Sequence, residues 1–186
     1  MHRRGLRGKL QRLGLGHTSV TDAGLKELAG LKQLKELKLS DPTITDAGLK
    51  HLAGLLELQK LDLLATQVTD TGLKHLARLK KLQKLNLYKA SQVTDAGLKH
   101  LAGLKQLHEL GLSFTPVTGA GLRYLTELRH LRKLCLHDTK VTDGALKYLV
   151  HFRELRSLTL HGTLVSNSGI HVLNEALPKA FITGGR

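Results

Sequence analysis

The sequence has few of the residues that usually build reactive sites or strongly anchored interfaces. Its 186 residues include no tryptophan, three tyrosines, three phenylalanines and one cysteine. The single cysteine, Cys135, excludes an internal disulfide and is typical of a reducing compartment or of a fold that needs no cross-links. The scarcity of aromatic rings disfavours single-strand nucleic-acid sites, which stack bases on such rings.

Long apolar runs are also missing. No stretch reaches the roughly 18 apolar residues of a membrane-spanning helix, and no signal-peptide core follows the basic start of the chain. We therefore expect a soluble protein of the cytoplasm that makes no membrane contact. The charge is strongly positive, with 29 lysines and arginines against 15 acidic residues, which favours anionic partners without indicating a fold.

What the sequence has in abundance is one unit, repeated nearly from end to end. Each copy contains a version of V-T-D-A-G-L, and the copies are spaced by 24 residues, with one step of 25. Such a fixed period is typical of an array in which each unit packs only on its neighbours. The hydroxyl residues that open the successive copies are Thr21, Thr45, Thr69, Thr94, Thr118, Thr142 and, in a degenerate form, Ser166.

Each copy predicts one short strand and one short helix. The strand follows from L-x-x-L-x-L segments such as residues 82–87, which alternate apolar and polar positions with the period of a half-buried strand. The Thr-Asp pair can cap free backbone N–H groups at a helix start. Apolar residues spaced i, i+3 and i+4, such as Leu49, Leu52 and Ala53, then give the helix one buried face.

Stacked copies of this unit predict an α/β fold: a right-handed solenoid shaped like a horseshoe. Parallel strands about 4.8 Å apart would line its concave face, and short helices about 8–10 Å apart its convex face. We expect one domain over residues 1–186 with about seven repeats of 24 residues. Within it, residues 1–9 would be a frayed N-terminus and residues 166–186 a degenerate last repeat.

The L-x-x-L-x-L segments and the Thr-Asp-Ala-Gly-Leu helix starts resemble leucine-rich repeats. Among these they are similar to ribonuclease-inhibitor-like repeats, to the cysteine-containing repeats found beside F-boxes, and to long bacterial arrays. Such relatives place Asn or Cys after the strand, and here we expect a ladder of hydroxyls that bond the turn backbone instead. That place holds Thr18, Thr66, Thr115, Thr139 and Thr163, with Pro42 and Ser91 as exceptions.

Three irregularities interrupt the array. One extra residue near positions 89–91 predicts a bulge in the turn before Thr94. Gly119 replaces the aspartate at one helix start, and Gly144-Ala145 inverts the usual Ala-Gly order one repeat later. We interpret all three as neutral drift in tolerant turns.

The resemblance implies a module that binds a protein through its concave face and has no catalytic activity and no cofactor. Outward positions of stacked strands form rows, and Leu64 and Tyr88, with Phe114 nearby, make a small apolar group among charged residues. Such a group is typical of a modest interface centre, and we expect a protein partner of acidic or mixed charge. The predicted partner-binding residues are Lys38, Lys60, Asp62, Leu64, Lys84, Asn86, Tyr88, Phe114, Lys133, His137 and His161.

A second cluster contains the chain's single thiol. Cys135 and His137 lie two apart on one predicted strand, with His161 on the next strand and His108 and Asp138 nearby. This closeness suits a thiolate–imidazole pair or a zinc site. A flat strand face offers no pocket and no oxyanion donors, however, so we expect neither catalysis nor a resident metal.

Two alternative functions stay open. One is polyanion or nucleic-acid binding by a basic row on the predicted helices, although no nucleic-acid motif accompanies it. The other is substrate recognition in a ubiquitin-ligase-like assembly, which requires a further domain or partner because the nine residues before Leu10 hold no F-box. The basic row consists of Lys26, Lys50, Lys74, Lys99, Arg123 and Lys147.

Overall fold

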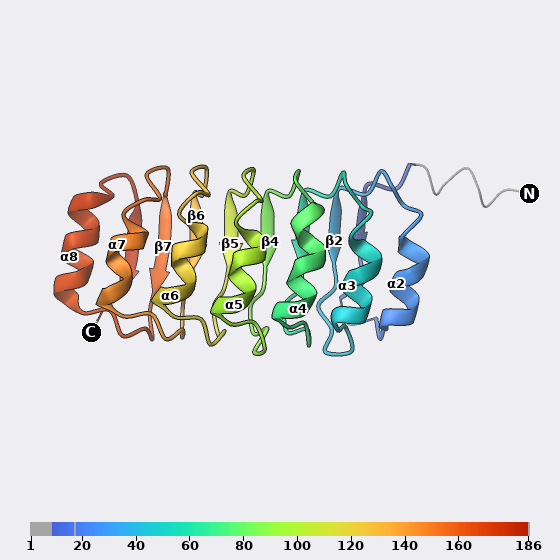
Figure 1. Cartoon of the computed structure of the whole chain (residues 1–186), viewed down its shortest axis with the longest axis horizontal. Helices are drawn as coiled ribbons and strands as arrows, with labels where there is room; N and C mark the ends of the chain where they lie inside the picture. The colour runs from blue at the N-terminus through green and yellow to red at the C-terminus, as the bar shows by residue number, and fades with distance from the viewer. Residues whose placement is uncertain (1–8, 17, 186) are drawn as a thin grey trace, which may run out of the picture.

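The computed structural model describes residues 9–16 and 18–185. They form two layers, a sheet of short strands and a line of short helices that packs on one side of it, with successive repeats following one another along the molecule (Figure 1). Except for Lys9, the segment predicted to be a frayed N-terminus lies outside the described residues. The division into a single domain over residues 1–186 stays a prediction.

The sheet has eight parallel strands, and their order in space is their order in the chain. Each strand pairs with its neighbour at equivalent positions, so Leu37, Leu61 and Leu85 form one continuous row. The sequence therefore predicted the architecture and the register correctly. The strands are β1 (Arg12–Gly14), β2 (Glu36–Lys38), β3 (Lys60–Asp62), β4 (Lys84–Asn86), β5 (Glu109–Gly111), β6 (Lys133–Cys135), β7 (Ser157–Leu160) and β8 (Phe181–Gly184).

The α-helices are α2 (Asp22–Leu28), α3 (Asp46–Leu52), α4 (Asp70–Leu73), α5 (Asp95–Leu98), α6 (Gly119–Leu122), α7 (Leu146–Leu149) and α8 (Asn167–Ala176). α2 and α3, with seven residues each, have the two α-helical turns that the sequence predicts, α8 is longer with ten, and the α-helices between α3 and α8 are shorter, with four residues each. Several are single α-helical turns that continue as 3-10 turns. The 3-10 turns are η1 (Lys74–Arg78), η2 (Lys99–Leu101), η3 (Arg123–Leu125) and η4 (Asp143–Ala145).

The core is a strip of aliphatic side chains between the two layers. Leucines from the strands, the helices and the connecting turns are almost all inaccessible to solvent, and Phe152 is a fully buried aromatic side chain among them. Because each helix is too short to persist alone, this shared apolar strip must hold it in place. The polar side chains of the strands are thereby directed to the opposite face of the sheet.

The predicted ladder of hydroxyls is confirmed, with one correction. Thr66, Thr115, Thr139 and Thr163 are buried, and each hydroxyl donates to the carbonyl three residues earlier over 2.6–2.8 Å. The exception in the fourth turn is Ala90 rather than Ser91, because the backbone N–H of Ala90 donates to Leu87 as the threonines do and its methyl is buried. Ser91 is the exposed extra residue.

The aspartate at each helix start acts on the next repeat and not on its own helix. One carboxylate oxygen accepts the backbone N–H of the next helix-opening residue over 2.7–2.9 Å. The other accepts that residue's hydroxyl over 2.5–2.7 Å. We call this set the Asp–Thr ladder. It comprises Asp22–Thr45, Asp46–Thr69, Asp70–Thr94, Asp95–Thr118 and Asp143–Ser166.

The ladder decides whether a helix is capped. Each hydroxyl held by an aspartate also accepts a backbone N–H from the first turn of its own helix, over 3.0–3.3 Å. Thr142, which follows the repeat with Gly119 in place of aspartate, makes no such cap, and neither does Thr21 at the start of the array. The neighbouring carboxylate therefore orients the hydroxyl, and a missing aspartate leaves the next helix uncapped.

The ladder also explains the glycine two residues after most helix-start aspartates. A methyl group on Gly121 would lie 2.9 Å from the Cα of Asp95 and closer still to its carboxylate. Gly48, Gly72, Gly97 and Gly169 meet the preceding aspartate in the same way. Close packing at a stacked position is thus the reason for these glycines.

Gly119 and Ala145 lie against each other, so we expect the two substitutions to be coupled rather than to be independent neutral drift. Ala145 occupies the position of the packing glycine, and Gly119 occupies the position of the aspartate that it would meet. A Cβ on Gly119 would lie 2.9 Å from the Cβ of Ala145, which is fully buried. The alanine methyl therefore fills space that a carboxylate fills elsewhere, and Thr142 has no aspartate to bind its hydroxyl.

The last pair of the Asp–Thr ladder, Asp143 with Ser166, should make the stability of the protein depend on pH in a testable way. The pKa of Asp143 lies below its ordinary value of 3.8, because the hydroxyl and the backbone N–H of Ser166 donate to its carboxylate. Because this pKa is lowered in the folded state, ionised Asp143 stabilises the fold. Its contribution to the free energy of unfolding is complete above about pH 4 and is lost as the pH falls through the folded-state pKa. We expect the difference in Tm between the wild type and Asp143→Asn to be constant near neutral pH and to shrink below about pH 4. A difference that stays the same at every pH would contradict this.

Candidate protein-binding face

The surface of the sheet away from the helices, here called the strand face, carries the predicted binding residues. In β2 to β6 the middle leucine is buried while the first and third residues point outward. The parallel register then places Glu36, Lys60, Lys84, Glu109 and Lys133 in one row across β2–β6. The structure thus brings together side chains that are 24 or 25 residues apart in the sequence.

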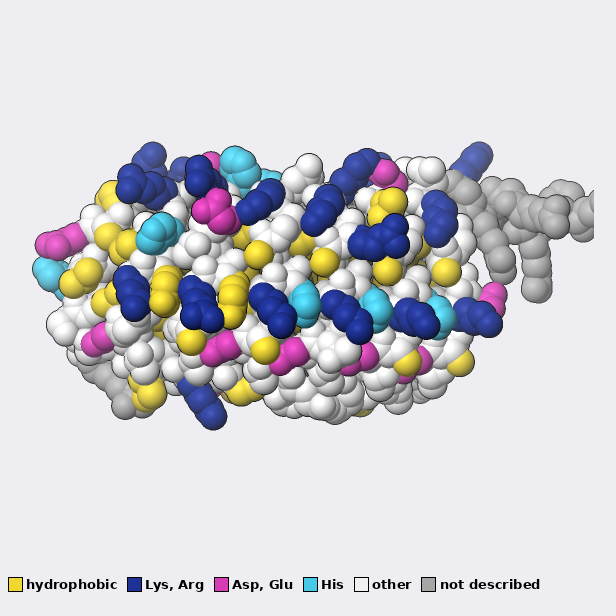
Figure 2. Space-filling view, viewed as in Figure 1, with side chains coloured by type: hydrophobic (Ala, Val, Ile, Leu, Met, Phe, Trp, Pro, Cys, Tyr) yellow, Lys and Arg dark blue, Asp and Glu magenta, His cyan; other side chains and the backbone are white. Residues whose placement is uncertain are grey.

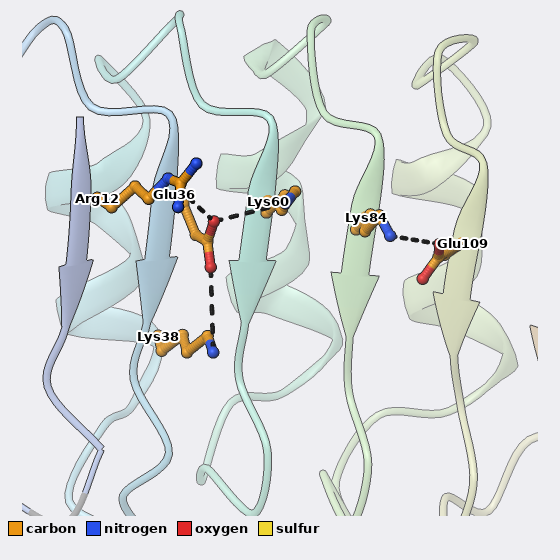
Figure 3. Close-up of polar contacts among 6 residues, drawn as sticks. All are labelled: Arg12, Glu36, Lys38, Lys60, Lys84 and Glu109. Atoms are coloured by element: carbon orange, nitrogen blue, oxygen red, sulfur yellow. Dashed lines mark hydrogen bonds and ion pairs between the residues drawn. The ribbon is translucent and has the colours of Figure 1, made fainter.

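Ion pairs link neighbouring strands across this face (Figure 3). Glu36 lies between three cations, with its carboxylate 3.9 Å from Arg12, 4.0 Å from Lys38 and 3.5 Å from Lys60. Lys84 pairs with Glu109 on the next strand. These partly exposed pairs contribute little stability each, but they fix the orientation of the side chains.

A shallow groove of about 320 Å³ runs over the middle of the strand face. Gly111 adds no side chain to its floor, and the amide of Asn86 donates to the Asp62 carboxylate over 2.9 Å beside it. Six of the predicted partner-binding residues therefore share one surface. They are Lys38, Lys60, Asp62, Lys84, Asn86 and Lys133.

A line of rings borders the groove where the strands end, and we call it the aromatic row. The rings of Tyr88 and Phe114 have centroids 5.0 Å apart, those of Phe114 and His137 4.9 Å, and those of His137 and His161 6.3 Å, all edge to face. Half-buried Leu64 precedes Tyr88 at the equivalent position. Tyr88 and Phe114, which the sequence grouped, are therefore in contact, and the line of rings continues to His137 and His161.

Phe114 adopts a backbone conformation that a bulky residue seldom takes. Its φ is +59°, and the same turn position has φ of +56° at Ala65, +59° at Lys89 and +51° at Asp138. A left-handed conformation costs a residue with a side chain about 1–2 kcal/mol. The turn imposes this conformation in every one of these repeats, and a phenylalanine there places its ring between Tyr88 and His137 at a cost in stability.

Two residues of this region differ from expectation. Ser113 occupies the same row position as Tyr88 and His137, yet it is buried, with 5% of its surface exposed. Its hydroxyl accepts the backbone N–H of His137 over 3.2 Å. The sequence interpretation also missed Lys89, whose ammonium group lies 5.5 Å from the Tyr88 ring centre and 5.6 Å from that of Phe114.

The thiol and histidine cluster is spread along the face. Half-buried Cys135 lines the groove, while the Nε2 atom of His137 lies 2.9 Å from Asp138 and its ring contacts Phe114. His108 contacts His130 at the opposite ends of the strands, with centroids 6.4 Å apart. Across residues 9–16 and 18–185, no three histidine, cysteine or acidic side chains converge as metal ligands would.

Solved structures with the same arrangement identify the fold. The chain is similar to an internalin from Listeria monocytogenes (TM-score 0.76, 22% identity), covering 93% of this chain and 46% of that one. It is similar to internalin C2 from the same organism (TM-score 0.77, 27% identity), covering 92% of this chain and 69% of that one. This chain is a leucine-rich-repeat solenoid.

A leucine-rich-repeat protein of Leptospira interrogans is a third neighbour, with a TM-score of 0.58, 21% identity and coverage of 85% of this chain and 45% of that one. The solenoid thus spans less than half of the length of two of these three proteins. No protein-family model and no curated protein matches the sequence. The resemblance to ribonuclease-inhibitor-like and F-box-associated repeats stays a prediction.

The opposite surface of the solenoid carries the basic row of the helices. Figure 2 shows it as a line of lysines and arginines with histidines beside one half and apolar side chains beside the other. In the described part of the chain, none of these six cations has a carboxylate within 4 Å. Partial burial and the nearby Lys74 lower the pKa of His75, whereas a hydrogen bond to Tyr124 raises that of Arg123.

The solenoid's helices are all short. In the part of the chain that the structure describes, none is long and apolar enough to cross a membrane.

Proposed function

We propose that this solenoid is a protein-recognition module that binds its partner through the strand face, with the aromatic row as the centre of the interface. The observation that carries the proposal is the strained Phe114, whose ring is held between Tyr88 and His137. Aromatic residues ringed by polar side chains are typical of interface centres. Binding without catalysis is part of this proposal, as is a partner of acidic or mixed charge.

The charge on the strand face supports such a partner. Lys38, Lys60 and Lys84 are each paired with a glutamate, and these pairs can exchange for contacts with an incoming carboxylate. Lys133 lies next to Glu109 in the sheet register and has no carboxylate within 4 Å among the described residues. Matching a partner's charges to these positions would set its orientation and its association rate more than its affinity.

The single cysteine offers a direct test. A photo-activated cross-linker attached to Cys135 sits in the groove, so a partner bound to the strand face is expected to be captured by it. The matched control is Cys135→Ser with Lys74→Cys, which carries the same reagent on the helix side. Capture of the same protein with equal yield from both positions would contradict binding through the strand face.

The variant Phe114→Gly separates binding from folding. It removes two ring contacts of about 0.5–1.5 kcal/mol each, but it also relieves a strain of about 1–2 kcal/mol, so stability is expected to stay nearly unchanged. Capture from Cys135 is expected to fall at least about tenfold, as for a central interface residue. Thermal unfolding measured on the same samples verifies the fold, and unchanged capture by a stable variant would remove the aromatic row from the interface.

A further inference from the structure

A second hollow opens at the other ends of the strands, where the chain enters β4–β7. Its volume is about 440 Å³. It shares Lys84, Glu109 and Lys133 with the groove of the strand face, so the two form one continuous surface. The residues that line it are Gln83, Lys84, His108, Glu109, Arg132, Lys133 and Arg156. We call it the basic hollow.

The positive charge of the basic hollow exceeds what its own carboxylates neutralise. Glu109 is the single acidic residue in its lining and pairs with Lys84. Arg132 has one distant partner, Glu154, at 3.7 Å, and that carboxylate also lies 3.1 Å from His130. Within the described ranges, Lys133 and Arg156 have no carboxylate within 4 Å. Two cations are therefore free to bind an anion, and a third is weakly held.

The shape and chemistry of the basic hollow fit an acidic protein segment. Arginine binds carboxylates through two parallel hydrogen bonds, and Arg132 and Arg156 stand on neighbouring repeats, where successive acidic side chains could reach them. The lining has no Phe, Tyr or Trp ring, and His108 is its single aromatic side chain, so it offers little surface on which nucleic-acid bases could stack. Continuity with the groove means that one protein partner could cover both surfaces.

The geometry points to an acidic docking site: the basic hollow binds a glutamate- or aspartate-rich segment of the protein that occupies the strand face. This inference deepens the proposed function and rests on it for the nature of the partner. Lys133 and Arg156 supply the cations without a carboxylate partner, and Arg132 adds a weakly held third.

The test measures binding of a fluorescent oligoglutamate peptide by anisotropy, so it needs no knowledge of the partner. The hollow variant, Lys133→Gln with Arg156→Gln, is expected to weaken binding about tenfold at low salt, and added salt is expected to weaken wild-type binding. The matched control, Lys50→Gln with Lys74→Gln, removes the same charge from the helix side. It is expected to bind within about twofold of the wild type. Thermal unfolding verifies that both variants fold.

The possible outcomes separate this inference from its alternatives. Equal weakening by both variants would show attraction to net charge alone, and no measurable binding to the wild type would also overturn the docking site. Tighter binding of a short single-stranded DNA, lost in the hollow variant, would assign the hollow to nucleic acid instead. Phe114→Gly is expected to bind the peptide like the wild type, so failure of the aromatic interface and failure of the basic hollow can be told apart.

Discussion

The Gly121→Ala variant is expected to be about 2–4 kcal/mol less stable than the wild type, a large share of the 5–15 kcal/mol typical of a folded domain. The added methyl would lie 2.9 Å from the Cα of Asp95, so a side-chain movement alone cannot make room for it. Displacing Asp95 would break its bonds to the backbone N–H and the hydroxyl of Thr118. Urea unfolding followed by circular dichroism measures the loss.

The first repeat contains the matched control for this change. Gly24 holds the same position on α2, but among the described residues its nearest neighbour atoms belong to Val20, 3.9 Å from the site of a Cβ, and no aspartate lies within 4 Å of that site. Because alanine is favoured over glycine inside a helix, Gly24→Ala is expected to stabilise the protein by about 0.5–1 kcal/mol. Effects of the same sign at Gly24 and Gly121 would contradict the assignment of these glycines to the Asp–Thr ladder.

The second large effect on stability is expected from restoring the missing pair of the Asp–Thr ladder, in which an aspartate at position 119 would bind Thr142. Gly119→Asp alone crowds the Ala145 methyl, and Ala145→Gly alone leaves a void in a buried position, so each change should destabilise by about 1–3 kcal/mol. Together they recreate the Asp–Gly arrangement of the other repeats. The new carboxylate could then accept the backbone N–H and the hydroxyl of Thr142, as Asp95 does for Thr118.

A double-mutant cycle measures this coupling. The double variant is expected to be about 2 kcal/mol more stable than the sum of the two single changes in unfolding free energy would give. The added replacement Thr142→Ala provides a control, because Thr142 makes no cap in the wild type and would make one in the double variant. Strict additivity, or an equal cost of Thr142→Ala in both backgrounds, would mean that Gly119 and Ala145 are independent substitutions after all.

The sequence was enough to assign one part of the candidate site, but not the rest. The row that holds Tyr88 and His137 was predictable, because its members recur at a fixed spacing. The excess charge of Arg156 and Lys133 was not, because it depends on which carboxylates lie within 4 Å in the folded chain. Nor did the sequence show that Lys89 lies near the rings of Tyr88 and Phe114. Its side chain reaches them from a backbone in the left-handed conformation, which the sequence does not reveal.

The sequence by itself determined the solenoid. A constant period and a two-residue alternation leave little choice but parallel strands in register, so the rows of the strand face follow by counting. Only the tertiary structure decided how those rows are used. Whether Asp95 caps its own helix or holds Thr118, and whether the Phe114 ring meets Tyr88 and His137, depends on distances between repeats. Such distances are set by backbone conformation and side-chain packing across the stack, which no single repeat contains.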